Sequence, residues 1–231
     1  MEVEGRKSHY STSTASPNTK DALTGEYHET RVADIATGAK VADALPHIDF
    51  VMPMGSAQDV KGHVADLHEF EAVVNHTTKP IVFVSPDFEG CRAAVEMCEA
   101  VAGGGEAFRR HPFATCYINV TSGLTANQEA LQKCIYLAKK GLPQLWIPLN
   151  AGGVNAPATT AGCMASMNAG IMTGIVLAQL VREGSPVAVP GWNGGPYNLK
   201  TMVGNYVLAD EQGVPTSMGK YYGLPVFGLG G

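Results

Sequence analysis

The chain has 231 residues, of which 45% are hydrophobic and 16% are charged, and its formal net charge at pH 7 is −5. This composition excludes a disordered segment and allows one large α/β domain with a sizeable core. The negative charge offers no basic surface to nucleic acid or anionic lipid, so neither is expected as a partner.

The location of the protein is predicted from its N-terminus, its apolar stretches and its cysteines. The first residues, Met1-Glu-Val-Glu-Gly-Arg6, are polar, and no apolar signal segment follows them. The longest apolar stretch, 169–181, is too short to cross a bilayer and is expected in a buried helix. The five cysteines include no Cys-x-x-Cys pair. We therefore predict a cytoplasmic protein with reduced, buried thiols and no membrane partner.

Short apolar runs, each with a proline at its entry or exit, alternate with segments long enough for a helix. Residues 1–30 are predicted to form strand and turn pieces, and 32–45 have the apolar spacing of a helix. Strands are predicted within 44–54, 79–85, 112–120, 143–149, 185–190 and 224–229. Helices are predicted at 66–75, 89–102, 127–140, 159–182 and 210–222, whereas 199–208 is ambiguous between helix and strand.

Repeated strand–helix units predict an α/β fold, either a TIM (β/α)8-type barrel or an open doubly wound sheet. The chain supplies five units and a sixth strand, so a barrel would be an incomplete, central portion that spans 1–231 as a single domain. No Gly-x-Gly-x-x-Gly follows the first strand, which weakens the nucleotide-binding alternative. Barrel chemistry lies where the strands end. The residues there are Met54, Ser85, Asn119, Asn150 and Gly191.

Neither a metal site nor an activated nucleophile is indicated by the motifs. His63 and His68 are five residues apart, which matches no familiar zinc spacing, and no metal site is predicted. There is no Gly-x-Ser-x-Gly elbow, and Ser56 and Ser122 are expected to have turn or capping roles.

A glycine-rich loop at 151–160 precedes the longest predicted helix. Such a loop can cradle a phosphate, but no Lys or Arg accompanies it before Arg182. Gly152 and Gly153 could instead let a flat, bulky ligand approach the backbone, while neighbouring asparagines supply neutral hydrogen bonds. A simply flexible loop is the alternative.

Aromatic side chains gather near the later strand ends. Trp192, Tyr197 and Tyr206 have few cationic neighbours, so their ring faces could hold a tertiary or quaternary ammonium group by cation–π attraction. Packing of loop residues is the alternative interpretation.

An ordered series of segments resembles the trimethylamine methyltransferase family of corrinoid-dependent methyltransferases. The series covers nearly the whole chain, and the order of its segments is more specific than any one of them. The segments are Val3-Glu-Gly-Arg6, 33–54, Thr77-Thr-Lys-Pro-Ile81, 152–162, 168–180 and Tyr221-Tyr-Gly-Leu-Pro225.

This resemblance implies a TIM barrel that moves a methyl group from trimethylamine or a quaternary amine such as glycine betaine. The acceptor implied is the Co(I) corrinoid of a separate carrier protein. We expect no metal of the chain's own and a homo-oligomer at full length. Gly152 and Gly153 would then face the corrinoid, and the expected amine-binding residues are Asn119, Asn150, Trp192, Asn193 and Tyr206. The catalytic residues are not indicated.

Two departures from the family leave alternatives open. Members of the family are much longer, so the chain would be a central portion of the barrel. Trimethylamine members use pyrrolysine, and none is written here. The chain is either a relative without pyrrolysine that acts on a quaternary amine, or a reading frame that ends at an amber codon. Rival hypotheses are a TIM-barrel lyase or aldolase using Lys200 or Lys220, and a non-catalytic barrel fragment.

Overall fold

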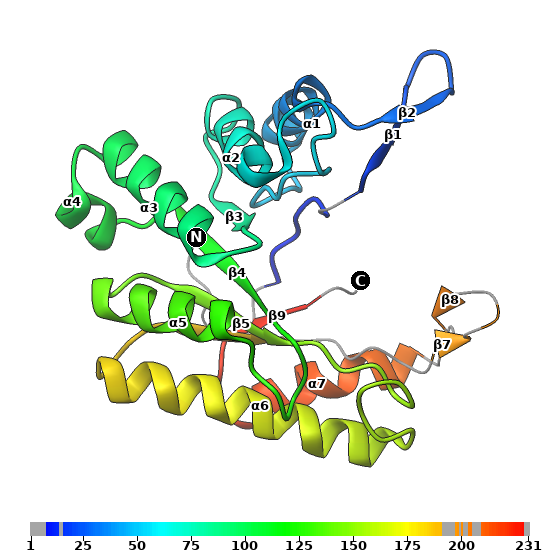
Figure 1. Cartoon of the computed structure of the whole chain (residues 1–231), viewed down its shortest axis with the longest axis vertical. Helices are drawn as coiled ribbons and strands as arrows, with labels where there is room; N and C mark the ends of the chain where they lie inside the picture. The colour runs from blue at the N-terminus through cyan, green and yellow to red at the C-terminus, as the bar shows by residue number, and fades with distance from the viewer. Residues whose placement is uncertain are drawn as a thin grey trace. The chain divides into compact units, whose positions relative to one another are not determined.

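The computed structural model describes residues 8–13, 16–190, 197–198, 200, 203–204 and 209–228 (Figure 1). The chain divides into two compact units, Met1–Cys116 and Tyr117–Gly231, and the boundary falls within a strand. Each unit is described on its own below.

The first unit begins with an antiparallel hairpin and continues with helices and a short strand. The hairpin joins β1 (Asn18–Lys20) to β2 (Tyr27–Glu29). The other elements are α1 (Val32–Ala44), a 3-10 turn (Gly62–Val64), α2 (Ala65–Val74), β3 (Ile81–Val84), α3 (Phe88–Ala102) and α4 (Gly105–Arg110). The helices predicted at 32–45, 66–75 and 89–102 are confirmed, with ends shifted by one residue.

Local chemistry explains why α3 begins and ends where it does. The Asp87 carboxylate accepts a hydrogen bond from the Gly90 N–H at 2.7 Å, which caps the first turn. Gly103 ends the helix in the left-handed conformation, with a φ of 82°. The triple glycine predicted this stop but not the next helix, because the chain turns at Gly104 and starts α4 at once.

The prediction of a strand within 44–54 is wrong, because this segment forms no regular strand. Only Phe50 and Val51 make parallel bridges, to Ser11 and Ile81. At Met52 the backbone hydrogen-bonds to a side chain instead of to the backbone of a neighbouring strand. The Thr12 hydroxyl accepts a hydrogen bond from the Met52 N–H and donates one to its C=O, both at 2.8 Å. Pro53 then removes the next donor, so the strand cannot continue.

The second unit carries most of the sheet and the longest helix. Its sheet begins with β4 (Ala114–Val120), which crosses the boundary between the units, and the strand order is β3-β4-β5-β6-β9. The other elements are α5 (Gln128–Lys140), β5 (Gln144–Pro148), α6 (Thr160–Val181), β6 (Val187–Pro190), β7 (Tyr197–Asn198), β8 (Val203–Gly204), α7 (Ala209–Tyr221) and β9 (Val226–Phe227). The parallel α/β class is confirmed, and the five-stranded sheet is consistent with part of the predicted barrel, of which the complete form is not shown.

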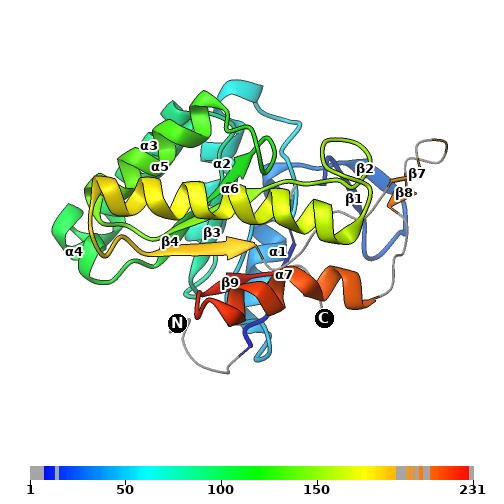
Figure 2. The same cartoon turned by 90° about the horizontal axis from the view of Figure 1, so that it is seen from below.

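One face of this sheet packs against helices. Trp146 of β5 is 1% exposed, and its indole N–H donates to the Gly170 C=O of α6 at 2.9 Å. On β6, Val189 joins Met164, Met167 and Ile171 of α6 in one apolar cluster. Figure 2 shows α6 running alongside β6. The core of the second unit therefore lies between the sheet and α6.

The other face of the sheet is concave. Tyr117 lies on β4 and Phe227 on β9, with β5 and β6 between them. In a flat sheet the three strand spacings would separate them by about 14 Å. Their ring centroids are only 5.8 Å apart, so the sheet must curl strongly toward this face. Curling of this kind is what a partial barrel requires.

The helix expected around the apolar stretch 169–181 is confirmed, but it is longer than that stretch. Within the described part of the chain, α6 has 22 residues and is apolar enough to cross a membrane by length and composition alone. A third of its most apolar window, 33%, is buried. Core helices of soluble proteins satisfy the same criteria, and the packing on Trp146 gives α6 a core face.

Candidate active site

The loops that follow β4 and β5 are fastened to each other at the carboxyl ends of these strands. The Asn155 side-chain amide donates to the Leu149 C=O at 2.9 Å and to the Thr121 C=O at 3.3 Å. Its side-chain oxygen accepts from the Ala151 N–H at 2.7 Å. Strand ends that meet at one edge are where barrel enzymes place their chemistry.

Asn150 is a buried clamp between these loops and α6. The residue is 4% exposed, and its side-chain oxygen accepts from the Gly123 N–H at 2.7 Å. Its amide nitrogen donates to the Cys163 C=O at 3.1 Å and to the Ser166 hydroxyl at 2.8 Å. These bonds use both ends of the amide for internal contacts, and direct contact with an amine stays a prediction.

The loop after β4 lies directly against α6. A Cβ atom on Gly123 would collide with the backbone of Ser166, and one on Gly170 would lie 2.7 Å from the Cα of Gly123. Only glycine allows two backbones to approach this closely. Together with Asn150, this contact fixes the loop that continues from Asn119.

The glycine-rich loop after β5 is ordered by its own backbone. Gly152 is buried and bridges to Ala156, while the Gly153 N–H donates to the Ala156 C=O at 2.8 Å. Gly153 has a φ of 78°, so a side chain there would be strained. Val154 is 59% exposed beside it. The loop thus presents an exposed, uncharged surface next to the strand ends.

The strands β4, β5, β6 and β9 present only uncharged side chains on the concave face of the second unit. On β4, Ile118 and Val120 are buried, whereas Tyr117 and Asn119 alternate onto the opposite face. The register pairs Val189 with Val226, whose side chains pack against the helices, so Phe227 is directed to the concave face with Tyr117. Asn119 is exposed there, near the carboxyl end of its strand.

In the first unit, strand-end residues are tied to α2. Ser85 is 3% exposed, and its hydroxyl donates to the Asp66 carboxylate at 2.6 Å. The Glu69 carboxylate accepts a hydrogen bond from the Ala57 N–H at 2.8 Å. Burial is the main cause that raises the pKa of the Glu69 carboxyl, and the negative charge of the nearby Asp66 raises it further. These contacts hold the segments after 50–51 and after β3 against α2.

Thiol chemistry is disfavoured by burial. All five cysteines are buried, as the sequence predicted. Burial raises the pKa of Cys98 to about 12 and that of Cys134 to about 11, so both stay protonated at neutral pH. Among the residues that the structure describes, no three His, Cys, Asp or Glu side chains gather as metal ligands.

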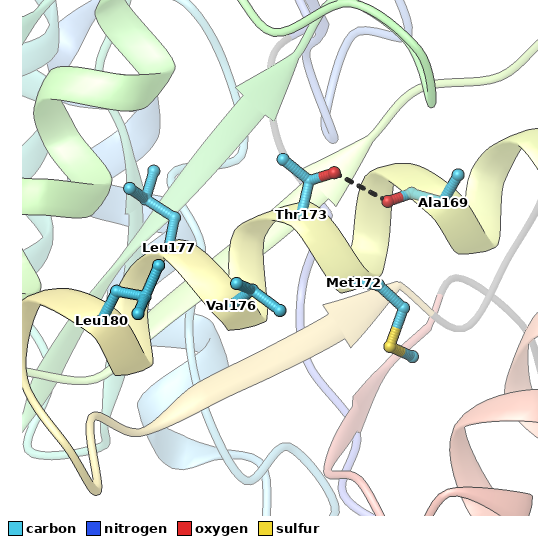
Figure 3. Close-up of a pocket in the computed structure, with 6 residues that line it drawn as sticks. All are labelled: Ala169, Met172, Thr173, Val176, Leu177 and Leu180. Atoms are coloured by element: carbon cyan, nitrogen blue, oxygen red, sulfur yellow. Dashed lines mark hydrogen bonds between the residues drawn. The ribbon is translucent and has the colours of Figure 1, made fainter.

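An apolar depression lies on the outer side of α6 (Figure 3). Thr173 is the only hydroxyl residue among the six that line it, and it donates to the Ala169 C=O of its own helix at 2.9 Å. Val176 and Leu180 are 54% and 80% exposed. Because this surface offers so little polar chemistry, it suits packing rather than catalysis. The lining residues are Ala169, Met172, Thr173, Val176, Leu177 and Leu180.

The predicted site residues are only partly brought together by the described structure. Asn119, Asn150, Gly152 and Gly153 lie on or after β4 and β5, whereas Gly191, Trp192, Asn193 and Tyr206 lie outside the described residues. Sequence reasoning missed the meeting of Tyr117 with Phe227. The alternation along β4 places Tyr117 on the face of Asn119, and this signal could have drawn attention to it.

The family profile and the similar curated proteins that match this chain carry the same family name. The sequence profile described as "Trimethylamine methyltransferase (MTTB)" matches residues 1–228. The chain is 29% identical over 214 residues to trimethylamine methyltransferase MttB of Desulfitobacterium hafniense, covering 91% of this chain and 43% of that protein. It is 32% identical to MttB of Methanosarcina thermophila, with coverages of 85% and 42%.

A glycine betaine methyltransferase of Desulfitobacterium hafniense is also similar, at 24% identity over 213 residues, with coverages of 90% and 44%. The chain therefore spans less than half the length of the curated relatives it matches.

Proposed function

We propose that this chain, which belongs to the trimethylamine methyltransferase family, forms part of an enzyme that demethylates a tertiary or quaternary methylamine. The observation that carries the proposal is the family match over residues 1–228. The proposed acceptor is the corrinoid of a separate carrier protein, and the proposed location is the cytoplasm. Trimethylamine and glycine betaine are the two candidate substrates, since relatives of both names match the chain.

The site's chemistry is compatible with this proposal. A Co(I) corrinoid, when presented by its carrier, supplies a strong nucleophile for the methyl group. The chain's part is to bind the amine, orient one methyl group and exclude water. The uncharged concave face around Asn119 suits the first two tasks because its strands carry no Lys or Arg that would repel the ammonium group. The exposed loop at Gly153 and Val154 suits a broad, flat partner.

The lyase or aldolase alternative receives less support. A Schiff-base lysine needs a desolvated position that lowers its pKa. Lys200 and Lys220, the two lysines considered for this role, are exposed, and the family match points to methyl transfer. We further propose that the full-length protein is a homo-oligomer, and the exposed apolar side of α6 is a surface that an assembly could cover.

Docking of the carrier can be tested at Val154 without straining the backbone. A side chain at Gly153 would be strained at its φ of 78°, so loss of activity there would be ambiguous. Val154→Trp adds bulk at the exposed loop instead. In the longest polypeptide that contains this sequence, we expect the KM for the carrier protein to rise about tenfold, corresponding to ~1.4 kcal/mol. The KM for the amine should stay unchanged.

The matched control is Val101→Trp, since Val101 is 61% exposed near the end of α3 and Val154 is 59% exposed. The control should leave both KM values at the parent level. Equal effects of the two variants, or a change confined to the amine KM, would contradict docking at the glycine-rich loop.

A further inference from the structure

Two aromatic rings meet at a corner of the concave face, on strands whose own sequences carry no charged residue. Tyr117 and Phe227 meet with centroids 5.8 Å apart and ring planes inclined at 71°. Both side chains are half-buried. The four strands of this face contain no Asp, Glu, Lys or Arg. They are β4, β5, β6 and β9.

This corner has the features that select an alkylated ammonium over other cations. A steeply inclined ring pair can present its faces to two sides of one ligand, and each face carries negative charge density. A primary ammonium group loses its hydrogen bonds to water on such a surface, and no carboxylate on these strands replaces them. A trimethylammonium group has at most one N–H to satisfy, and its methyl groups spread the charge over an apolar exterior.

Nearby residues make the corner rigid on one side. Asn119 extends the same face of β4 toward the loop that Gly123 and Asn150 hold against α6. On the other side, Phe227 follows Val226, whose side chain packs into the cluster of α6 and β6 residues. Both rings therefore lie on strands that are held in place by packing and hydrogen bonds, which lowers the entropic cost of ordering the rings around a ligand.

We propose that Tyr117 and Phe227 form the recognition wall for the methylated ammonium group of the substrate. The assignment rests on the proposed function, and it names the positive alkylammonium end of the substrate as the part that is recognised. Trp192 and Tyr206 are not required for this wall. The contact is a binding interaction and changes no covalent bond.

The test uses tetramethylammonium as the cation probe and neopentyl alcohol as a neutral molecule of similar size. Binding is measured by ligand-observed NMR with the longest polypeptide that contains this sequence. Tyr117→Leu and Phe227→Leu should each weaken tetramethylammonium binding about tenfold and alter neopentyl alcohol binding by less than about twofold. Tyr117→Phe retains the ring and should bind the cation nearly as the parent does.

Cation binding at the parent level in both leucine variants would overturn the proposal, as would equal losses for the cation and the alcohol. If the leucine variants unfold, fluorinated phenylalanine incorporated in place of Phe227 keeps the shape and weakens the ring's charge. Affinity for the cation should then fall with each added fluorine, and a constant affinity would refute the assignment.

Methyl transfer by the parent protein is measured alongside, so that two failures can be told apart. If the parent transfers methyl groups while the variants bind the cation normally, the aromatic wall is wrong and the proposed function stands. If the ring variants lose the cation but the parent shows no methyl transfer, the binding wall stands and the proposed reaction is wrong.

Discussion

Replacing Gly174 with alanine is expected to lower the free energy of unfolding by about 3 kcal/mol. A Cβ atom at this position would collide with the indole ring of Trp146, which is 1% exposed and fills the space between β5 and α6. Moving the ring would also disturb its hydrogen bond to the Gly170 C=O. Urea denaturation followed by far-UV circular dichroism measures the loss.

Gly213→Ala is the matched control, because Gly213 lies in α7 and, among the described residues, no atom outside its own helix backbone and chain neighbours lies within 4 Å of an added Cβ. Alanine is the better helix former, so this variant should gain about 0.5–1 kcal/mol. Equal stability changes in the two variants would show that Gly174 does not pack on Trp146 in solution.

Asn150→Ala is expected to cost about 3 kcal/mol, because three hydrogen bonds are lost in a buried site. The Gly123 N–H and the Cys163 C=O would lose a partner, and the loop after β4 should loosen. Hydrogen exchange of residues 121–127 should therefore accelerate well before global unfolding. Thermal melts and amide exchange by mass spectrometry measure the two effects.

Asn150→Asp separates hydrogen bonding from shape. The carboxylate can still accept from the Gly123 N–H, but it cannot donate to the Cys163 C=O and would repel it. We expect most of the stability loss of the alanine variant. Asn168→Asp is the control, since Asn168 makes one exposed bond, to the Tyr222 hydroxyl at 3.1 Å. Asn150→Asp with parent-like stability would contradict the clamp.

Elements with strong local signals could be predicted from the sequence. Apolar spacing and glycine stops identified α1, α3, α5 and α6, because these signals lie within a single helix. The strand at 44–54 failed for one local reason, Pro53, and one non-local reason. The N–H and C=O of Met52 are both hydrogen-bonded to the hydroxyl of Thr12, which lies forty residues away in the sequence. No pattern within the predicted strand indicates that contact.

The candidate site shows the same limit more sharply. The sequence marked Asn150 as a strand-end residue, which it is, but its contacts with Gly123 and Ser166 depend on how the loop crosses α6. The ring pair depends on curling of the sheet, which brings together Tyr117 and Phe227 from strands that are not neighbours. Side-chain periodicity gives the face of each residue but not the curvature that makes two faces meet.

The central claim, methyl transfer from a methylated amine, is tested most directly by the absorbance of the reduced corrinoid carrier. The longest polypeptide that contains this sequence would be mixed with the Co(I) carrier protein and, in turn, trimethylamine, glycine betaine and other quaternary amines. The account predicts that at least one amine consumes the Co(I) signal in an enzyme-dependent manner and leaves an equivalent amount of demethylated amine. Absence of this change with every methylated amine, under conditions where an authentic family member reacts with the same carrier, would contradict it.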